Sequence, residues 1–315
     1  MLMRKLLFMF LLFTSLRGDE VLDNLARDAY LASINAVIVF TSQDGLSSGI
    51  YRFTNIETEM RMYNLPFQYQ FGALSEHTNL FLIMDLGYSD TTSNREIAIG
   101  GRTLHKNNRL QTYVGGLGLG IRYRPTEHSD LQFGGEMIYS RAGVTTRVGE
   151  GLNGEDVKNF FSDDFNENYS YKLLAEYIYH REIQKHKVYV RVNYKLYQTL
   201  SEITVGGVVG DIVEDVFSLR SQTSVASATL SYETKPLYSY HDMSFTLEPF
   251  VKGNYIWGDL ATVAEINGYG TVGLTAYWNT PKKAVYIYRY FIEPSVSKGY
   301  GLEGANLSLG FSLDF

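Results

Sequence analysis

The chain of 315 residues contains no cysteine. This absence excludes a disulfide framework, a zinc–thiolate cluster and catalysis by a cysteine nucleophile. The formal net charge of −6 argues against nucleic acid as a principal partner, because phosphate binding requires clustered lysine and arginine. Long apolar runs are also missing: the longest, Leu6–Phe13, is far shorter than the roughly 20 residues of a membrane-spanning helix. The chain is instead rich in 25 Tyr, 18 Phe and 29 Gly beside only 6 Pro, which favours many strands.

The N-terminus predicts a secretory signal peptide over residues 1–18. Arg4 and Lys5 precede the apolar run, and mostly small or polar residues follow it up to Gly18, near which we place the cleavage site. An exported, acidic chain without cysteine fits a bacterial envelope better than a disulfide-rich secreted context.

Residues 19–33 predict a helix. Apolar side chains recur there at helical spacing, namely Leu22, Leu25, Ala29 and Ala32. A helix of this length is marginal alone, so we expect it to plug the lumen of a barrel. There Asp23 and Asp28 would pair with cations of the wall.

From Asn35 onward the apolar period changes from 3.6 to 2. The last nine residues show this most clearly, since polar or small residues alternate with Leu307, Leu309, Phe311, Leu313 and Phe315. Segments of about ten residues with this alternation are typical of a transmembrane β-barrel. We expect a barrel over residues 34–315 with about twelve strands, near 35–42, 49–72, 78–90, 108–125, 129–143, 167–183, 186–200, 218–235, 243–258, 268–280, 283–298 and 304–315.

The connections between these segments support the same architecture. Short links at 72–77, 125–129, 183–186, 235–242 and 280–283 mostly alternate with longer ones at 90–107, 144–166 and 200–218. Outer-membrane barrels have short periplasmic turns and long extracellular loops. The predicted fold class is therefore an all-β, antiparallel outer-membrane barrel with both chain ends on the periplasmic side. A soluble β-sandwich is the alternative, but its strands average about half the predicted length.

Two local irregularities need an explanation. Before Pro66 the apolar residues stand at even positions, as in Met60 and Met62, but around it they stand at odd positions, as in Leu65 and Phe67. We expect a β-bulge near Pro66 to account for this change. A glycine run, Gly115, Gly116, Gly118 and Gly120, lies within a strand. We expect it to allow close approach of the plug or to relieve strand curvature.

Charged residues on the polar rows of the strands predict the lining of the lumen. These residues are Glu136, Glu176, Arg191, Lys195, Glu248 and Arg289. A lumen lined by polar and charged side chains is the expected interior of such a barrel.

The terminal stretch 304–315, which ends in Phe, resembles the C-terminal assembly signal of Gram-negative outer-membrane proteins. The resemblance implies recognition by the barrel-assembly machinery through Leu309, Phe311, Leu313 and Phe315.

The chain as a whole resembles the translocator domain of autotransporters, a twelve-stranded barrel with a helix in its pore. The similarity is carried by the strand count, the helix at 19–33 and the terminal Phe. Because the predicted helix directly follows the predicted signal peptide, we expect a solitary barrel of this type without a passenger domain.

Catalytic and metal-binding readings find little support in the sequence. The six histidines, His77, His105, His128, His180, His186 and His241, form no metal or catalytic motif, and only His105 falls in a predicted outer loop. The acidic loop 151–168 lacks the ordered spacing of a calcium loop. We therefore expect no enzyme activity, no metal and no cofactor.

The expected function is structural or associated with transport, in the outer membrane. The expected partners are outer-membrane lipid, lipopolysaccharide and the barrel-assembly machinery, and nucleic acid is not expected. A small-solute channel is the alternative, followed by a barrel hydrolase.

Overall fold

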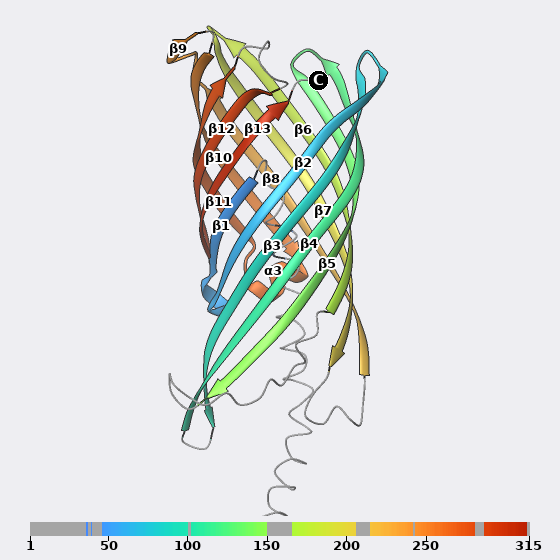
Figure 1. Cartoon of the computed structure of the whole chain (residues 1–315), viewed down its shortest axis with the longest axis vertical. Helices are drawn as coiled ribbons and strands as arrows, with labels where there is room; N and C mark the ends of the chain where they lie inside the picture. Colours follow the sequence, from blue (N-terminus) through green and yellow to red (C-terminus); the bar gives the residue numbers. More distant parts are fainter. Residues whose placement is uncertain are drawn as a thin grey trace, which may run out of the picture.

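The computed structural model of the chain is a closed antiparallel β-barrel (Figure 1). The structure describes Ala36, Val39 and residues 46–99, 102–149, 166–205, 215–241, 243–280 and 287–313. The predicted signal peptide (1–18), the predicted helix (19–33) and the terminal Phe315 lie outside the described residues.

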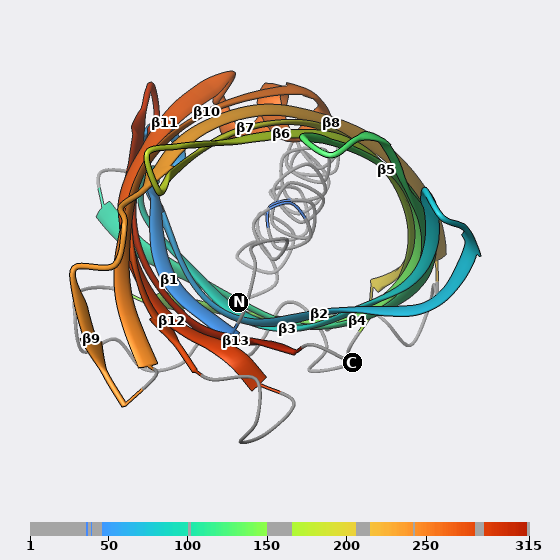
Figure 2. The ribbon, with the colours of Figure 1, turned by 90° about the horizontal axis from the view of Figure 1, so that it is seen from above.

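The ring contains all but one of the thirteen strands of a single sheet. Its members are β1 (Leu46–Phe53), β2 (Thr58–Ser75), β3 (Thr78–Ile99), β4 (Arg102–Thr126), β5 (Ser129–Gly149), β6 (Asn166–Ile183), β7 (His186–Val205), β8 (Asp215–Glu233), β10 (Met243–Gly258), β11 (Gly268–Asn279), β12 (Ile287–Gly299) and β13 (Leu302–Leu313). The first strand pairs with both β2 and β13, which closes the ring (Figure 2). The all-β fold class and the twelve-stranded barrel are thus confirmed, and the sandwich alternative is excluded.

Three short elements complete the described chain. The strand β9 (Tyr238–Tyr240) pairs with β10 and stands outside the ring (Figure 2). The 3-10 turn η1 (Thr54–Ile56) joins β1 to β2, and the helix α3 (Asp259–Ala264) lies between β10 and β11. No helix among the described residues is long and apolar enough to cross a membrane, an observation that concerns helices only.

The two ends of the barrel differ in their connections. At one end, here called the short-turn end, two-residue turns join β2 to β3, β4 to β5 and β6 to β7. At the other, here called the long-hairpin end, β3 and β4 remain paired as far as Ile99 and Arg102, well beyond the neighbouring wall (Figure 1). Strand structure therefore occupies much of the predicted loop 90–107. The predicted alternation of short and long connections is only partly met, because β3 to β4 and β12 to β13 are joined at this end by two residues each.

The start of the barrel differs from the prediction. Ala36 and Val39 are helical, so the strand predicted near 35–42 is wrong at these positions, and the first strand is β1. The single strand predicted over 49–72 is in fact β1 and β2, separated by a turn that ends with Glu57 at a φ of 50°. Periodicity cannot distinguish helix from strand in a short apolar run, and this turn contains neither Gly nor Pro.

The predicted bulge at Pro66 is also wrong. The ladder between β2 and β3 is regular through Pro66, and its register shifts come later, after Gln70. Met60 and Met62 are buried inside the barrel, whereas Leu65 and Phe67 are exposed on its outside. The parity slips because the lumen is apolar at this level, not because the backbone is irregular.

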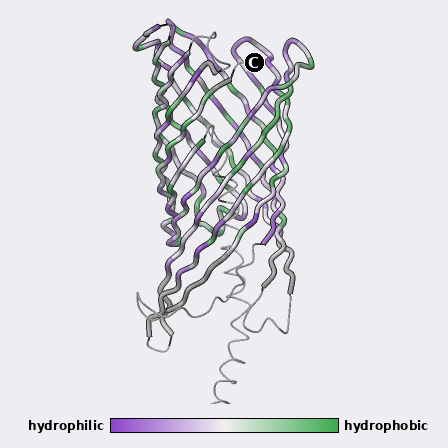
Figure 3. The backbone as a smooth tube through the Cα atoms, viewed as in Figure 1, coloured by the Kyte–Doolittle hydropathy of each residue, from purple (hydrophilic) through white to green (hydrophobic). Residues whose placement is uncertain are grey.

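The outer surface carries apolar side chains along every strand. Hydrophobic and hydrophilic residues alternate along the strands (Figure 3). The rings of Tyr63, Tyr88 and Tyr113 form a row across three strands, in which Tyr63 and Tyr113 are exposed and Tyr88 is half-buried. Exposed aromatics also lie near the short turns, namely Tyr123, Tyr232, Trp278 and Tyr290. Two aromatic bands around an apolar belt are the expected surface of a barrel that spans a membrane.

Candidate functional site: the interior of the barrel

Buried apolar side chains fill the lumen toward the long-hairpin end. They form one contiguous cluster, here called the apolar collar, of Ala36, Val39, Tyr51, Phe53, Met60, Met62, Leu110, Val114, Ile138, Ala142, Tyr197, Val225, Ile256, Leu260, Ala261, Ala264, Ile266 and Leu302. β1 and β7 stand on opposite sides of the ring. A cluster that contains both Tyr51 and Tyr197 therefore crosses the lumen.

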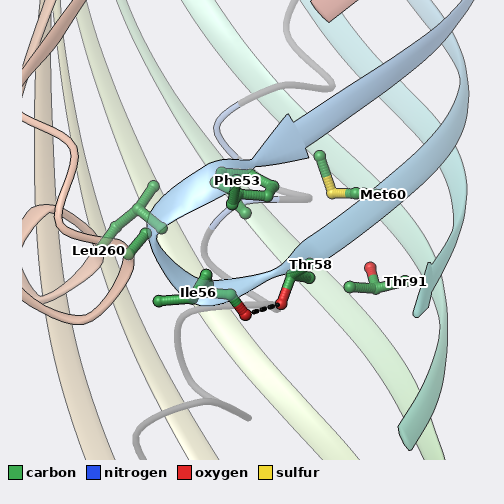
Figure 4. A pocket seen from close by; sticks show the side chains of 8 residues that line it. Phe53, Ile56, Thr58, Met60, Thr91 and Leu260 are labelled. Atoms are coloured by element: carbon green, nitrogen blue, oxygen red, sulfur yellow. Dashed lines mark hydrogen bonds between the residues drawn. The ribbon is translucent and has the colours of Figure 1, made fainter. Parts of the chain in front are cut away.

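Ala36 and Val39 lie within this collar although they precede the first strand. Their side chains are only 3% and 7% exposed. A small pocket between Ala36 and the wall is lined by Phe53, Ile56, Thr58, Met60, Thr91, Leu260 and Ala264 (Figure 4). The chain before β1 thus reaches the inside of the barrel at the long-hairpin end.

The connection between β10 and β11 folds inward and supplies part of the collar. Leu260, Ala261 and Ala264 of α3 are buried, and the side chain of Asn55 donates a hydrogen bond of 3.0 Å to the carbonyl of Glu265. The backbone N–H of Thr54 donates to the carbonyl of Gly301 at 3.0 Å. Three connections of the long-hairpin end are thereby held together on the side of the ring from β10 to β2.

A buried ionic triad lies on the inner wall beside the collar. Lys172 Nζ is 2.8 Å from Asp85 Oδ2 and 2.6 Å from Glu136 Oε2. The three side chains are 6%, 6% and 0% exposed. Two carboxylates thus share one ammonium group away from water, an arrangement that is stable only while all partners remain in place.

The glycine run in β4 makes room for this triad. A Cβ atom on Gly118 would lie 2.8 Å from both Cα and Cβ of Glu136, and one on Gly120 would lie 2.5 Å from Cε2 of Phe81. The Gly118 contacts are with the backbone and side chain of Glu136 on β5, and the Gly120 contact is with the side chain of Phe81 on β3. The glycines let Glu136 and Phe81 lie flat on the wall, whereas the predicted approach of a plug involves residues outside the described chain.

Toward the short-turn end the lumen is polar and charged. Arg289 forms an ion pair with Glu233, donates from Nε to Asn279 at 2.7 Å, and lies 3.8 Å from the ring centroid of Tyr277. Glu233 also accepts a hydrogen bond of 2.8 Å from Thr246. This half of the interior is therefore a hydrogen-bonded network, in contrast to the apolar collar.

The structure places the six residues predicted to line the lumen on inward rows, and four of them belong to three ionic groups. Glu136 belongs to the ionic triad, and Arg289 belongs to the network with Glu233. Glu176 and Arg191 form an ion pair of 3.6 Å across β6 and β7. Lys195 lies on the inward row of β7, and Glu248 lies on the inward row of β10, opposite Thr275. The predicted pairing of Asp23 and Asp28 with lumen cations lies outside the described residues, while Arg191 and Arg289 have partners from the wall.

The predicted assembly signal lies on the last strand of the ring. Leu309 and Phe311 face outward and are 44% and 54% exposed. Leu313 ends β13, and Phe315 lies outside the described residues.

Five of the six histidines lie at the short-turn end, whereas His105 lies in β4 near the tip of the long hairpin, and the described chain shows no catalytic arrangement around them. The rings of His128 and His180 stand 6.1 Å apart, and His186 stacks on Tyr232 at 5.1 Å. Among the described residues, no three His, Asp or Glu side chains are placed to hold a metal ion. The acidic loop 151–165 lies outside the described residues.

Sequence reasoning missed Asp85, Lys172 and Glu233. Each lies at a position where strand alternation places a charge on the inner row, so a complete reading of those rows would have found them. The apolar collar has no comparable sequence signal, because apolar side chains on both faces of a strand look alike.

Comparisons with known proteins show where this fold occurs. No protein-family model and no curated protein matches the chain. The β domain of the Bordetella autotransporter BrkA aligns at a TM-score of 0.57 and 8% identity, over 84% of this chain and 97% of that domain. The translocator domain of the autotransporter NalP from Neisseria meningitidis aligns at a TM-score of 0.57 and 14% identity, over 93% and 98%. The transport unit of AIDA-I from Escherichia coli aligns at 0.51 and 10% identity, over 87% and 91%. The chain therefore has the barrel fold of autotransporter translocator domains along most of its length.

Proposed function

We propose that this protein is an outer-membrane barrel of the translocator type whose lumen is closed by the segment that precedes β1. Its role is structural or associated with transport, and it has no catalytic activity of its own. The apolar collar around Ala36 and Val39 carries the proposal. An apolar lumen wall disfavours water, so this level of the lumen suits a packed polypeptide better than a stream of ions.

The proposed location follows from the wall. A closed barrel satisfies all backbone hydrogen bonds internally and can therefore span a bilayer. We place the short turns in the periplasm and the long hairpins outside the cell, as in other outer-membrane barrels. The proposed partners are outer-membrane lipid, lipopolysaccharide near the long hairpins, and the barrel-assembly machinery, which would read the last strand.

A small-solute channel is the second candidate. The polar short-turn half of the lumen, with Arg289, Glu233 and the pair Glu176–Arg191, resembles the lining of a conducting pore. The two candidate functions differ in whether the apolar collar blocks the passage of ions through the lumen.

Single-channel conductance in planar bilayers separates them. We compare the mature chain with two deletions, residues 19–32 and residues 19–45, and verify by heat-dependent gel mobility that each barrel is folded. We expect low conductance in the mature chain, more after the shorter deletion, and most after the longer one, which also removes Ala36 and Val39. Equal conductance of all three folded barrels would reject closure by this segment and favour the open channel.

A further inference from the structure

The short-turn end carries four exposed cations on two neighbouring connections. Arg181, Lys185 and Lys187 lie on the β6–β7 turn, and Lys235 lies on the connection between β8 and β10. All four are exposed, and none of them forms an ion pair with any residue that the structure describes. By contrast, toward the opposite end a carboxylate lies within 3.2 Å of each of Arg52, Arg61, Arg109 and Lys298.

These cations form one patch because the two connections are joined. The backbone N–H of Lys235 donates to Nδ1 of His186 at 3.1 Å, and the ring of His186 stacks on Tyr232. Lys187 lies on the inward row of β7, opposite Glu182 of β6 and Glu233 of β8. Glu233 is already paired with Arg289, and Glu182 is the single exposed carboxylate of the β6–β7 turn. Positive charge therefore remains in excess, and we call this group with Lys235 the basic rim.

Next to the basic rim the chain presents an apolar and aromatic flap. Leu237, Tyr238 and Tyr240 are 54%, 64% and 60% exposed. The last two belong to β9, which stands away from the ring on its outer side (Figures 1 and 2). The flap thus projects where the surface of the bilayer would meet the barrel.

The two features together match the surface of a charged membrane. Tyrosine is enriched at the level of lipid headgroups because its ring is apolar and its hydroxyl is polar. Lysine and arginine near a bilayer are attracted to anionic headgroups. We propose that the basic rim and the β9 flap form a binding surface for anionic phospholipid headgroups in the periplasmic leaflet. This inference rests on the proposed membrane location.

The test measures lipid selectivity of the mature chain. The protein is reconstituted in vesicles that contain phosphatidylcholine with spin-labelled phosphatidylglycerol or spin-labelled phosphatidylcholine, and the relative association of the two labelled lipids is recorded. We expect the wild type to prefer phosphatidylglycerol by about fivefold. The variant R181Q/K185Q/K187Q/K235Q should lose this preference, and Y238S/Y240S should weaken it.

The matched control, R52Q/R61Q/R109Q/K298Q, removes the same amount of charge toward the long-hairpin end and should keep the preference. Loss of selectivity in this control, or its persistence in the rim variant, would overturn the proposal. The proposal would also be overturned if the wild type showed no lipid preference but bound peptidoglycan sacculi through the same four cations. If the fourfold variant fails to fold, K185Q/K187Q and R181Q/K235Q should each lose part of the preference, and unchanged selectivity in both would reject it.

Heat-dependent gel mobility distinguishes failure of the basic rim from failure of the proposed membrane location. A barrel that inserts and folds in these vesicles without lipid selectivity refutes the basic rim alone. A chain that never inserts into a bilayer refutes the proposed location.

Discussion

The buried ionic triad gives the sharpest test of how this barrel is held together. The substitution Lys172→Met removes the ammonium group that Asp85 and Glu136 share and leaves two carboxylates without a cation. Because these carboxylates are at most 6% exposed, water cannot replace the lost partner. Breaking a buried ion pair by removing one member costs about 3–5 kcal/mol, and we expect a loss of that size in the free energy of unfolding.

The assay is urea unfolding of the barrel in detergent or vesicles, followed by tryptophan fluorescence and by heat-dependent gel mobility. The two tryptophans, Trp257 and Trp278, lie on the outer surface, 38% and 42% exposed, and therefore report contact with lipid. The control is Lys298→Met, which removes an 83% exposed side chain 3.2 Å from Glu303 and should cost less than about 1 kcal/mol.

A variant in which all three residues of the triad are neutral tests whether the loss comes from the unpaired charges. The variant D85N/E136Q/K172M keeps the shapes and removes all three charges, so it should recover most of the stability lost in Lys172→Met. If Lys172→Met is no less stable than Lys298→Met, the triad is not a buried electrostatic unit and the reasoning fails.

Three further predictions follow from the wall and its last strand. Gly118→Ala should lower the yield of folded barrel in a refolding assay, because its Cβ would lie 2.8 Å from the Cα of Glu136, whereas Gly115→Ala, with nothing closer than 3.9 Å, should refold normally; equal yields would contradict the crowding. Deletion of Phe315 should reduce the amount in the outer membrane but leave export across the inner membrane intact, and normal assembly would place the signal elsewhere. Envelope fractionation should recover the protein in the outer membrane with heat-dependent mobility, and recovery as a soluble periplasmic protein would refute the membrane location.

The sequence by itself determined the outside of the barrel. Leu309 and Phe311 alternate with small and polar neighbours because every second side chain of a strand faces the same way. This rule is local, so it can be read without knowing the partners of a strand. From β3 onward the strands also follow from this alternation, because polar connections interrupt it at intervals, whereas at β1 and β2 it misplaced one strand and merged two.

The tertiary structure alone decided the inside. Met60 and Met62 look like lipid-facing residues in sequence, yet they pack into the apolar collar because the interior at that level contains Ala36, Val39 and α3 instead of water. Likewise, the meeting of Asp85 with Lys172 depends on the register of four strands and on the glycines of β4 between them. Alternation along one strand does not tell which face of a strand with apolar residues on both sides turns inward, or which charges meet across the ring. Both depend on partners far away in the chain.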